Sequence, residues 1–293
     1  MRVLLFRTGL IWALAAFAAA GPFLFSGPAR NNAPGATPEE TFTTGEMLVY
    51  KVEWSPPWYL FFLPTMDAGE ATLGVFDGTE TEDGKETVRI VFTARSSGAF
   101  AKLAGVTVED HFESHADADT LCTISVQKKI REGKRKRDID VRFEPDRRRL
   151  HIRAVNVAAV PPKVDRDEYV NDIPPCVRDI FAALFEVRRR DFAEGVRHRS
   201  LVGDDDLVRE IETQVEKKEM VKTPHGRYET WKVNTVSLFG GLFKDGGQFR
   251  VWLTADSQKM PVKFEAKVRL GKVTGELTAL KRTTEEERDR SQP

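Results

Sequence analysis

The stretch from Gln248 to Leu280, QFRVWLTADSQKMPVKFEAKVRLGKVTGELTAL, decides the fold class of this chain. Two runs in which apolar and polar residues alternate flank a turn, and a third run begins after Leu270-Gly271-Lys272. Alternation with a period of two is typical of a β-strand that buries one face. The stretch therefore predicts three consecutive strands joined by tight turns.

The two faces of one of these strands can be assigned from the sequence. Phe249, Val251 and Leu253 fall on one face. Arg250 and Trp252 fall on the opposite face. One face should therefore line a core, and the other should meet solvent or a covering segment.

The same alternation recurs along most of the chain. Its apolar members are Leu48, Tyr50, Val52 and Trp54; Val88, Ile90, Phe92 and Ala94; Cys122, Ile124 and Val126; Ile139, Val141 and Phe143; Leu150, Ile152 and Ala154; Trp231 and Val233; and Val262, Phe264, Ala266 and Val268. A weaker run around Leu207 and Ile211 is interrupted by Arg209. Turn dipeptides such as Asp77-Gly78 separate the runs, and such short connections favour an antiparallel meander.

One segment follows a different period. Val177, Ile180, Phe181 and Leu184 recur at helical spacing. Pro175 suits a first helical turn, and Asp172 or Asn171 could cap it. We expect a helix from Pro175 to Arg188 that packs Ile180, Phe181 and Leu184 against a sheet. The predicted fold is mainly β: an antiparallel, strongly curved sheet or open barrel with one short amphipathic helix packed against it.

The N-terminal residues have the layout of an export signal. Arg2 and Arg7 precede an apolar run, and Ala18-Ala19-Ala20 fits a small-residue cleavage site. An uncleaved anchor is the alternative, because the apolar run continues through residues 22–25. We expect a signal peptide or anchor at 1–27, a flexible linker at 28–40, a single β-rich domain at 41–282 and a disordered tail at 283–293. This layout predicts an exported protein of the periplasm or cell envelope.

Charge and cysteine content narrow the class of protein. The chain has 45 Lys and Arg against 45 Asp and Glu, a balance that argues against a dedicated nucleic-acid binder. Its two cysteines, Cys122 and Cys176, can form one disulfide in an oxidising compartment, and two free thiols are the alternative.

A basic run lies between two predicted strands. Its charged members are Lys128, Lys129, Arg131, Lys134, Arg135, Lys136 and Arg137. The simplest interpretation is an exposed hairpin whose lysines also prevent edge-to-edge pairing of strands. The functional interpretation is contact with an anionic surface such as lipid or lipopolysaccharide.

Aromatic residues crowd a proline-broken segment from Trp54 to Pro64, and an apolar, glycine-broken segment at 236–243 could lie beside it. These segments are either loops folded onto the core or an apolar lip at a cavity, membrane or partner surface. The candidate ligand-binding residues are Trp54, Trp58, Tyr59, Phe61, Phe62, Phe239 and Phe243.

Catalytic and metal-binding patterns are weak in this sequence. His111 and His115 have helical chelate spacing, but they lie in an expected strand, where residues four apart are separated by about 13 Å. The acidic cluster at 204–206 has the pattern of a solvated turn. No motif of a nucleotide-binding loop or nucleophile elbow occurs. We expect neither metal, cofactor nor enzymatic activity.

Several blocks together resemble a family of exported bacterial proteins known as domain of unknown function 3108. In chain order they are Phe42–Tyr50, Asp67–Ala71, Cys176–Arg188, Val221–Thr230, Val251–Asp256 and Met260–Lys263. The resemblance implies a β-rich envelope domain and carries over no catalytic residue. The closing strands also look like those of periplasmic lipoprotein carriers, which have an open barrel, a helical plug and an apolar cavity; fold alone does not imply function.

Two functions fit these expectations. The first is a non-enzymatic envelope protein that binds a lipid or other hydrophobic small molecule in a β cavity, with the predicted helix covering one opening. The second is a structural or assembly factor of the envelope that contacts a protein partner or the membrane surface. Nucleic acid is not an expected partner.

Overall fold

The computed structural model describes residues 41–282 except 61, 80–83, 99–100, 102–104, 106, 205–206, 236–248 and 269–270. The predicted signal, linker and tail therefore lie outside the described residues. Among the residues described, no helix is long and apolar enough to cross a membrane.

Two antiparallel meanders flank one helix. The first comprises β1 (Glu46–Ser55), β2 (Met66–Asp77), β3 (Thr87–Ser96), β4 (Glu109–Asp117), β5 (Thr123–Glu132), β6 (Arg135–Glu144), β7 (Arg149–Asn156) and β8 (Lys163–Asn171). The second comprises β9 (Arg197–Asp204), β10 (Leu207–Lys222), β11 (Arg227–Thr235), β12 (Phe249–Thr254), β13 (Pro261–Val268) and β14 (Gly271–Arg282). The helix α3 (Ile180–Arg188) lies between them, and the short 3₁₀ helices η1 (Trp58–Leu60) and η2 (Pro145–Arg147) lie in connections.

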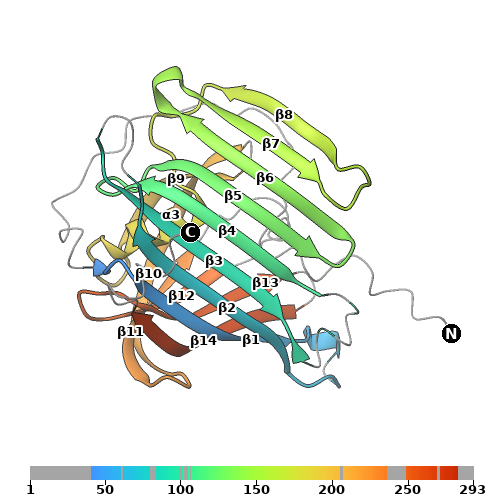
Figure 1. Cartoon of the computed structure of the whole chain (residues 1–293). Helices are drawn as coiled ribbons and strands as arrows, with labels where there is room; N and C mark the ends of the chain where they lie inside the picture. The colour runs from blue at the N-terminus through green and yellow to red at the C-terminus, as the bar shows by residue number, and fades with distance from the viewer. Residues whose placement is uncertain are drawn as a thin grey trace.

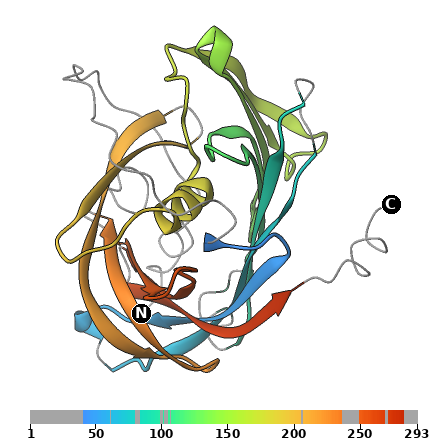
Figure 2. The same cartoon turned by 90° about the vertical axis from the view of Figure 1, so that its left-hand side faces the viewer.

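Pairing of β1 with β14 joins the meanders into a single sheet of 14 strands, in which β8 and β9 are the two edges. The sheet curls around α3 as an open barrel (Figures 1 and 2). Shifts of register within β1–β2, β4–β5, β10–β11 and β12–β13 mark bulges, which bend strands and increase their twist.

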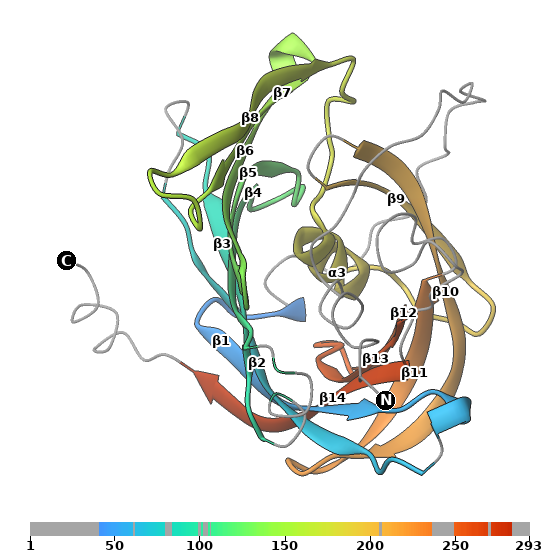
Figure 3. The same cartoon turned by 90° about the vertical axis from the view of Figure 1, so that its right-hand side faces the viewer.

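The antiparallel order gives the barrel two different ends. At the loop end, which faces the viewer in Figure 3, lie the connections β1–β2 (56–65), β5–β6 (133–134) and β7–β8 (157–162). At the helix end lie the connections β4–β5 (118–122), β10–β11 (223–226) and β12–β13 (255–260), together with the segments that flank α3.

The segment just before α3 bridges the open side of the barrel. The amide of Thr123 in β5 donates to the carbonyl of Val177 (2.8 Å), and the amide of Gly203 in β9 donates to the carbonyl of Arg178 (2.8 Å). Cys176 is bonded to Cys122 beside β5, with 5.1 Å between the Cα atoms, which confirms the predicted disulfide. This segment therefore links β5 to the edge strand β9.

The helix divides the interior into two apolar clusters. Ala182 and Phe185 belong to a large cluster that also contains Leu48, Ile90 and Ile152 of the first meander. Val187 belongs to a smaller cluster with Val215, Val233, Val251 and Leu253 of the second meander. The large cluster also includes Trp252, Val262 and Leu277 of the second meander, whereas the buried members of the small cluster come from α3 and β10–β12 alone.

Asp179 fixes the first turn of α3 to the first meander. Its side chain caps the helix by accepting from the amides of Phe181 (2.8 Å) and Ala182 (3.2 Å). Its other oxygen accepts from the hydroxyls of Thr123 (2.7 Å) and Ser114 (2.5 Å). A carboxylate is favourable at a helix N-terminus, where backbone amides lack partners.

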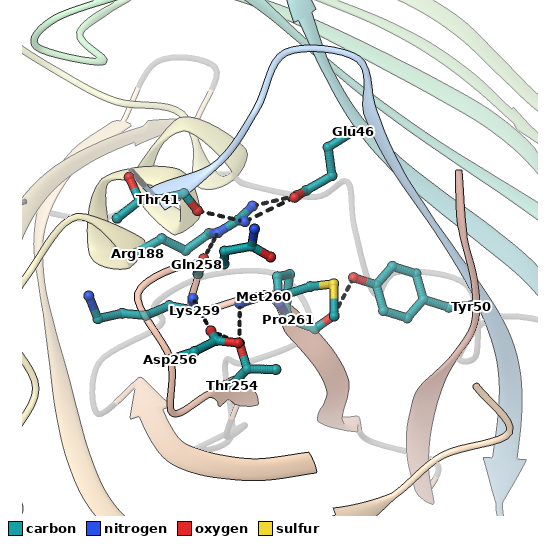
Figure 4. A network of polar contacts seen from close by, with 10 residues as sticks. All are labelled: Thr41, Glu46, Tyr50, Arg188, Thr254, Asp256, Gln258, Lys259, Met260 and Pro261. Carbon is teal, nitrogen blue, oxygen red and sulfur yellow. Dashed lines mark hydrogen bonds and ion pairs between the residues drawn. The ribbon is translucent and has the colours of Figure 1, made fainter. Parts of the chain in front are cut away.

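Arg188 fixes the last turn of α3 to two distant segments (Figure 4). Its guanidinium, which is 0% exposed, forms a bidentate ion pair with Glu46 of β1 (2.8 and 3.3 Å). It also donates to the carbonyls of Thr41 (3.0 Å) and Gln258 (3.1 Å), and it lies over the Phe185 ring at 5.0 Å. The helix is therefore tied to the start of the sheet and to the β12–β13 turn.

Tyr50 completes this network beside β13. Its buried hydroxyl donates to the carbonyl of Pro261 (2.7 Å). Burial raises the pKa of the Tyr50 hydroxyl well above its ordinary value, because the ionised form would lose hydration. Tyr50 therefore remains a hydrogen-bond donor and holds β1 against β13.

The predicted fold class is confirmed, with differences in detail. The helix begins at Ile180 rather than Pro175, and Asp179 is its cap instead of Asp172 or Asn171. Ile180, which we expected against the sheet, is 41% exposed. Most of β8, β9 and β10 is not predicted from the sequence. β8 is a largely exposed edge strand, and β9 and β10 carry many charged residues.

Arg188→Ala should destabilise the protein by about 3–5 kcal/mol, because it leaves the buried Glu46 carboxylate without its partner. Chemical denaturation of the purified protein measures this difference. The paired replacement Arg188→Met with Glu46→Leu should recover part of the loss, since it leaves no unpaired buried charge.

Lys51→Ala is the matched control for this experiment. Lys51 pairs with Glu53 on the same strand, at a site where both side chains are solvent-exposed, so the cost should stay below about 1 kcal/mol. Equal destabilisation by Arg188→Ala and Lys51→Ala would contradict the central role of Arg188.

Candidate functional site

An apolar groove lies between α3 and the inner face of β9–β12. Its lining residues are Ile180, Ala183, Leu184 and Val187 of α3; Ser200 and Val202 of β9; Ile211 and Thr213 of β10; Val233 and Thr235 of β11; and Phe249 and Val251 of β12. The strand residues belong mainly to the halves of these strands nearest the loop end.

The groove follows from two sequence periods. On α3, the lining residues recur at i, i+3, i+4 and i+7, which places them along one stripe of the helix. On the strands, each pair of lining residues is two positions apart, so both point to the same face. The groove is the region where the stripe of α3 and this face of the sheet are incompletely packed together.

The size of the cavity limits what it can hold. Its volume is about 60 Å³, which is room for a few water molecules at roughly 10–15 Å³ each by the same measure. A space of this size has room for a narrow apolar group but not for a whole lipid. A larger ligand would require α3 and β9–β12 to separate.

A few polar groups lie within or beside the apolar lining. Ser200, Thr213 and Thr235 contribute hydroxyls. The Ser200 hydroxyl donates to the buried carboxylate of Glu186 (2.9 Å), which also binds Arg190. Such groups can orient the polar end of a ligand whose remainder is apolar.

His198 lies on β9 near these groups, at the helix end. Its Nε2 contacts the carbonyl oxygen of Asp191 (3.0 Å). Burial lowers the pKa of the His198 imidazole, and the nearby charge of Arg190 lowers it further. The neutral form of the His198 imidazole is therefore favoured over the charged form.

The predicted aromatic residues do not line this groove. Trp54 is buried in β1, at 2% exposure, whereas Trp58, Tyr59 and Phe62 are exposed in the β1–β2 connection. That connection lies at the loop end, on the side of the sheet formed by the first strands (Figure 3). Phe61, Phe239 and Phe243 lie outside the described residues.

The predicted basic residues fall into three groups. Lys128 points into the barrel and is 7% exposed, so its side chain does not face an external anionic surface as we expected. The arginines are neutralised within the sheet: Arg131 by Asp138, Arg135 by Glu132 and Arg137 by Asp165. Lys129, Lys134 and Lys136 are exposed.

The sequence marks some of the groove residues as apolar positions of predicted elements, and it does not mark them as a site. The sequence predicts that Leu184 packs on a sheet, and it places Val233 and Val251 at apolar positions of alternating strands. Nothing in a period of two or 3.6 distinguishes a fully packed wall from one that borders a cavity. That difference depends on the distance between α3 and the second meander.

His111 and His115 flank one acidic residue on β4 rather than chelating together on a helix. His115 contacts the carboxylate of Glu113 at 3.0 Å and His111 at 3.6 Å. Burial acts to raise the pKa of Glu113, but the His115 hydrogen bond and the Arg89 charge lower it overall. Within the part of the chain that the structure describes, no cluster of His, Cys, Asp or Glu could hold a metal ion.

Two buried carboxyl groups lie at the loop end of β4 and β5. Burial and the neighbouring Asp110 carboxylate together raise the pKa of Glu132 to about 7, against the opposing charge of Arg135. Burial also raises the pKa of Asp110, which accepts from the amide of Arg131 (2.8 Å). The pair can store a proton near neutral pH, but it is separate from the groove.

Glu132→Gln should weaken the pH dependence of stability. In the unfolded chain Glu132 titrates near 4.5, and in the folded protein near 7, so the folded state loses stability as pH rises through this interval. A neutral glutamine removes that loss. Melting temperatures are measured for both proteins across this pH interval. At alkaline pH, Glu132→Gln should melt at a higher temperature than the wild-type protein.

Glu109→Gln provides the control, because Glu109 lies beside Asp110 but is exposed and pairs with Arg95. It should follow the pH profile of the wild-type protein. Parallel profiles for wild type and Glu132→Gln would show that Glu132 is not the titrating group.

Comparison with solved structures identifies a relative in fold. A β-barrel-like protein of domain of unknown function DUF1849 from Brucella abortus is similar with a TM-score of 0.55 and 11% identity, over 82% of this chain and 98% of that one. At this identity the likeness shows the fold alone. A protein from Bacteroides fragilis described as exported, with a YmcC-like fold, has a TM-score of 0.32 and 11% identity over 83% and 98% of the two chains.

Comparison of sequences places the chain more directly. No curated protein matches it. The model of a protein family of unknown function, DUF3108, matches residues 49–278. That range runs from β1 to β14 and contains the helix and the whole lining of the groove. This chain, with its curled sheet, central helix and groove, is therefore a member of the DUF3108 family.

Proposed function

We propose that this protein is a non-enzymatic, exported protein of the cell envelope that binds the apolar part of a lipid or similar hydrophobic molecule. The groove between α3 and β9–β12 is the proposed site. The observation that carries the proposal is the unfilled apolar space between two elements that are otherwise well packed. Protein interiors are usually close-packed, so such a space lined by aliphatic side chains favours a ligand over water.

Two features support export. The N-terminal residues have a basic start, an apolar run and small residues at the expected cleavage position. The Cys122–Cys176 disulfide suits an oxidising compartment such as the bacterial periplasm. It also holds the segment before α3 in place, and thus supports the wall on which the groove depends.

The chemistry of the groove favours binding over catalysis. All of its described lining residues are aliphatic, aromatic or hydroxyl-bearing, and none is titratable. General acid–base chemistry requires a titratable group within hydrogen-bond reach of the reacting atoms. The Asp110–Glu132 pair belongs to β4 and β5, on the other wall of the sheet.

Ala183→Phe should fill the groove and weaken ligand binding by at least about tenfold, which corresponds to about 1.4 kcal/mol. Ala183 lines the groove and is only partly buried, so the larger ring can enter the space without displacing Phe185. Binding is measured by titrating the protein with a fluorescent long-chain fatty acid. Native mass spectrometry of the purified protein checks for a co-purified lipid.

Ala193→Phe is the matched control, because Ala193 is exposed in the connection after α3. It adds the same ring outside the groove and should leave the affinity unchanged. If the wild-type protein neither binds the fatty acid saturably nor carries an apolar molecule, the proposal is wrong.

A second candidate, an assembly factor that acts by protein contact, rests on the edge strand β8. This strand is largely exposed, and its Val164 and Tyr169 are 45% and 50% exposed. An exposed edge can accept a strand from a partner. Cross-linking to an envelope protein that is lost on Val164→Pro, with the groove variants unaffected, would support this function.

A further inference from the structure

Exposed apolar side chains gather at the loop end of the barrel. In the β1–β2 connection, Trp58 is 86%, Tyr59 49% and Phe62 67% exposed. In the β7–β8 connection, Val160 is 97% exposed. Trp58 and Tyr59 pack edge to face, with ring centroids 5.8 Å apart, so they form one projecting aromatic unit on η1.

Their common location follows from the strand order. Successive antiparallel hairpins place alternate connections at the same end of the sheet. The β1–β2, β5–β6 and β7–β8 connections therefore lie along one rim of the sheet. Figure 3 looks onto this rim, with η1 in light blue at one side and the green hairpins of β5–β8 at the other.

Cationic side chains lie on the same rim. Lys134 in the β5–β6 turn and Lys136 at the start of β6 are exposed, and neither has an ion-pair partner among the described residues. Lys163 at the start of β8 is also exposed. The neighbouring arginines are internally paired, so these lysines carry the positive charge that is available for contact.

We propose that the loop end docks on the surface of a bilayer that contains anionic lipids. Trp and Tyr favour the interface between hydrocarbon and water, because their rings are apolar and their N–H or O–H groups remain hydrated. Lysines close to an anionic leaflet add an electrostatic attraction that salt weakens. The rim supplies both kinds of group at one end of the molecule.

The spacing of these groups favours a bilayer over a globular partner. The aromatic unit, the lysine hairpin and Val160 occupy three separate connections of one rim instead of one contiguous patch. A flat, deformable surface can meet all three at once. This inference is independent of groove occupancy, although docking would also turn the loop-end halves of β9–β12 toward the lipid.

The test is sedimentation of the protein with vesicles. A chain that begins at Pro28 is used, because it keeps every described element and lacks the apolar N-terminal run, which could bind vesicles by itself. Vesicles of pure phosphatidylcholine are compared with vesicles of equal parts phosphatidylcholine and phosphatidylglycerol. We expect binding to the anionic vesicles that weakens as salt rises.

Two variants probe the two components. Trp58→Ser with Phe62→Ser should reduce binding to the anionic vesicles by at least about tenfold. Lys134→Glu with Lys136→Glu should reduce it similarly and should also remove most of its salt dependence. Because these side chains are exposed, the melting temperature should remain that of the wild-type protein.

Met220→Ser with Lys222→Glu makes equivalent changes to exposed residues at the helix end of β10 and should bind as the wild type does. The proposal is overturned if the wild-type protein does not bind the vesicles. It is also overturned if Met220→Ser with Lys222→Glu loses as much vesicle binding as the rim variants do. Loss of a cross-linked protein partner in the rim variants, without any vesicle binding, would instead assign the rim to protein contact. Ala183→Phe should still bind vesicles, which separates failure of docking from failure of the groove.

Discussion

The buried guanidinium of Arg188 is the interaction on which the arrangement of the molecule depends. It lies at the end of α3 and binds Glu46, the first residue of β1, together with backbone carbonyls of Thr41 and Gln258. A buried cation is costly unless all of its donors are matched. The position of α3 relative to the start of the sheet and the β12–β13 turn is therefore narrowly defined.

The other end of the helix is restrained by different chemistry. Asp179 binds β4 and β5 through hydroxyl groups, and the disulfide ties Cys176 to the residue before β5. With both ends held, α3 cannot simply slide to fill every space around it. Its Ala182–Phe185 side is fully packed, whereas its Ile180–Val187 stripe leaves a groove against β9–β12. The proposed binding site is thus a consequence of how the helix is anchored.

The two ends of the barrel carry different groups. The buried Arg188–Glu46 ion pair, the helix cap and the disulfide lie at the helix end. The exposed aromatic side chains of η1 and the exposed lysines of the β5–β6 hairpin lie at the loop end, where connections between strands can present them without disturbing the core. The proposed docking on a bilayer at one end and the proposed ligand site in the groove would together suit a protein that exchanges hydrophobic molecules with a membrane.

Local pattern determined much of this protein: the strands with clear alternation, the presence of a helix near residue 180 and the turns. These follow from side-chain period and composition, which act over a few residues. Only the tertiary structure decided that the charged segment 212–222 is a strand, that Arg188 is a core residue and that Lys128 is buried. It also decided that the groove lies beside α3 and not under Trp58, because each of these outcomes depends on partners that are distant in sequence and are brought together by the closure of the sheet.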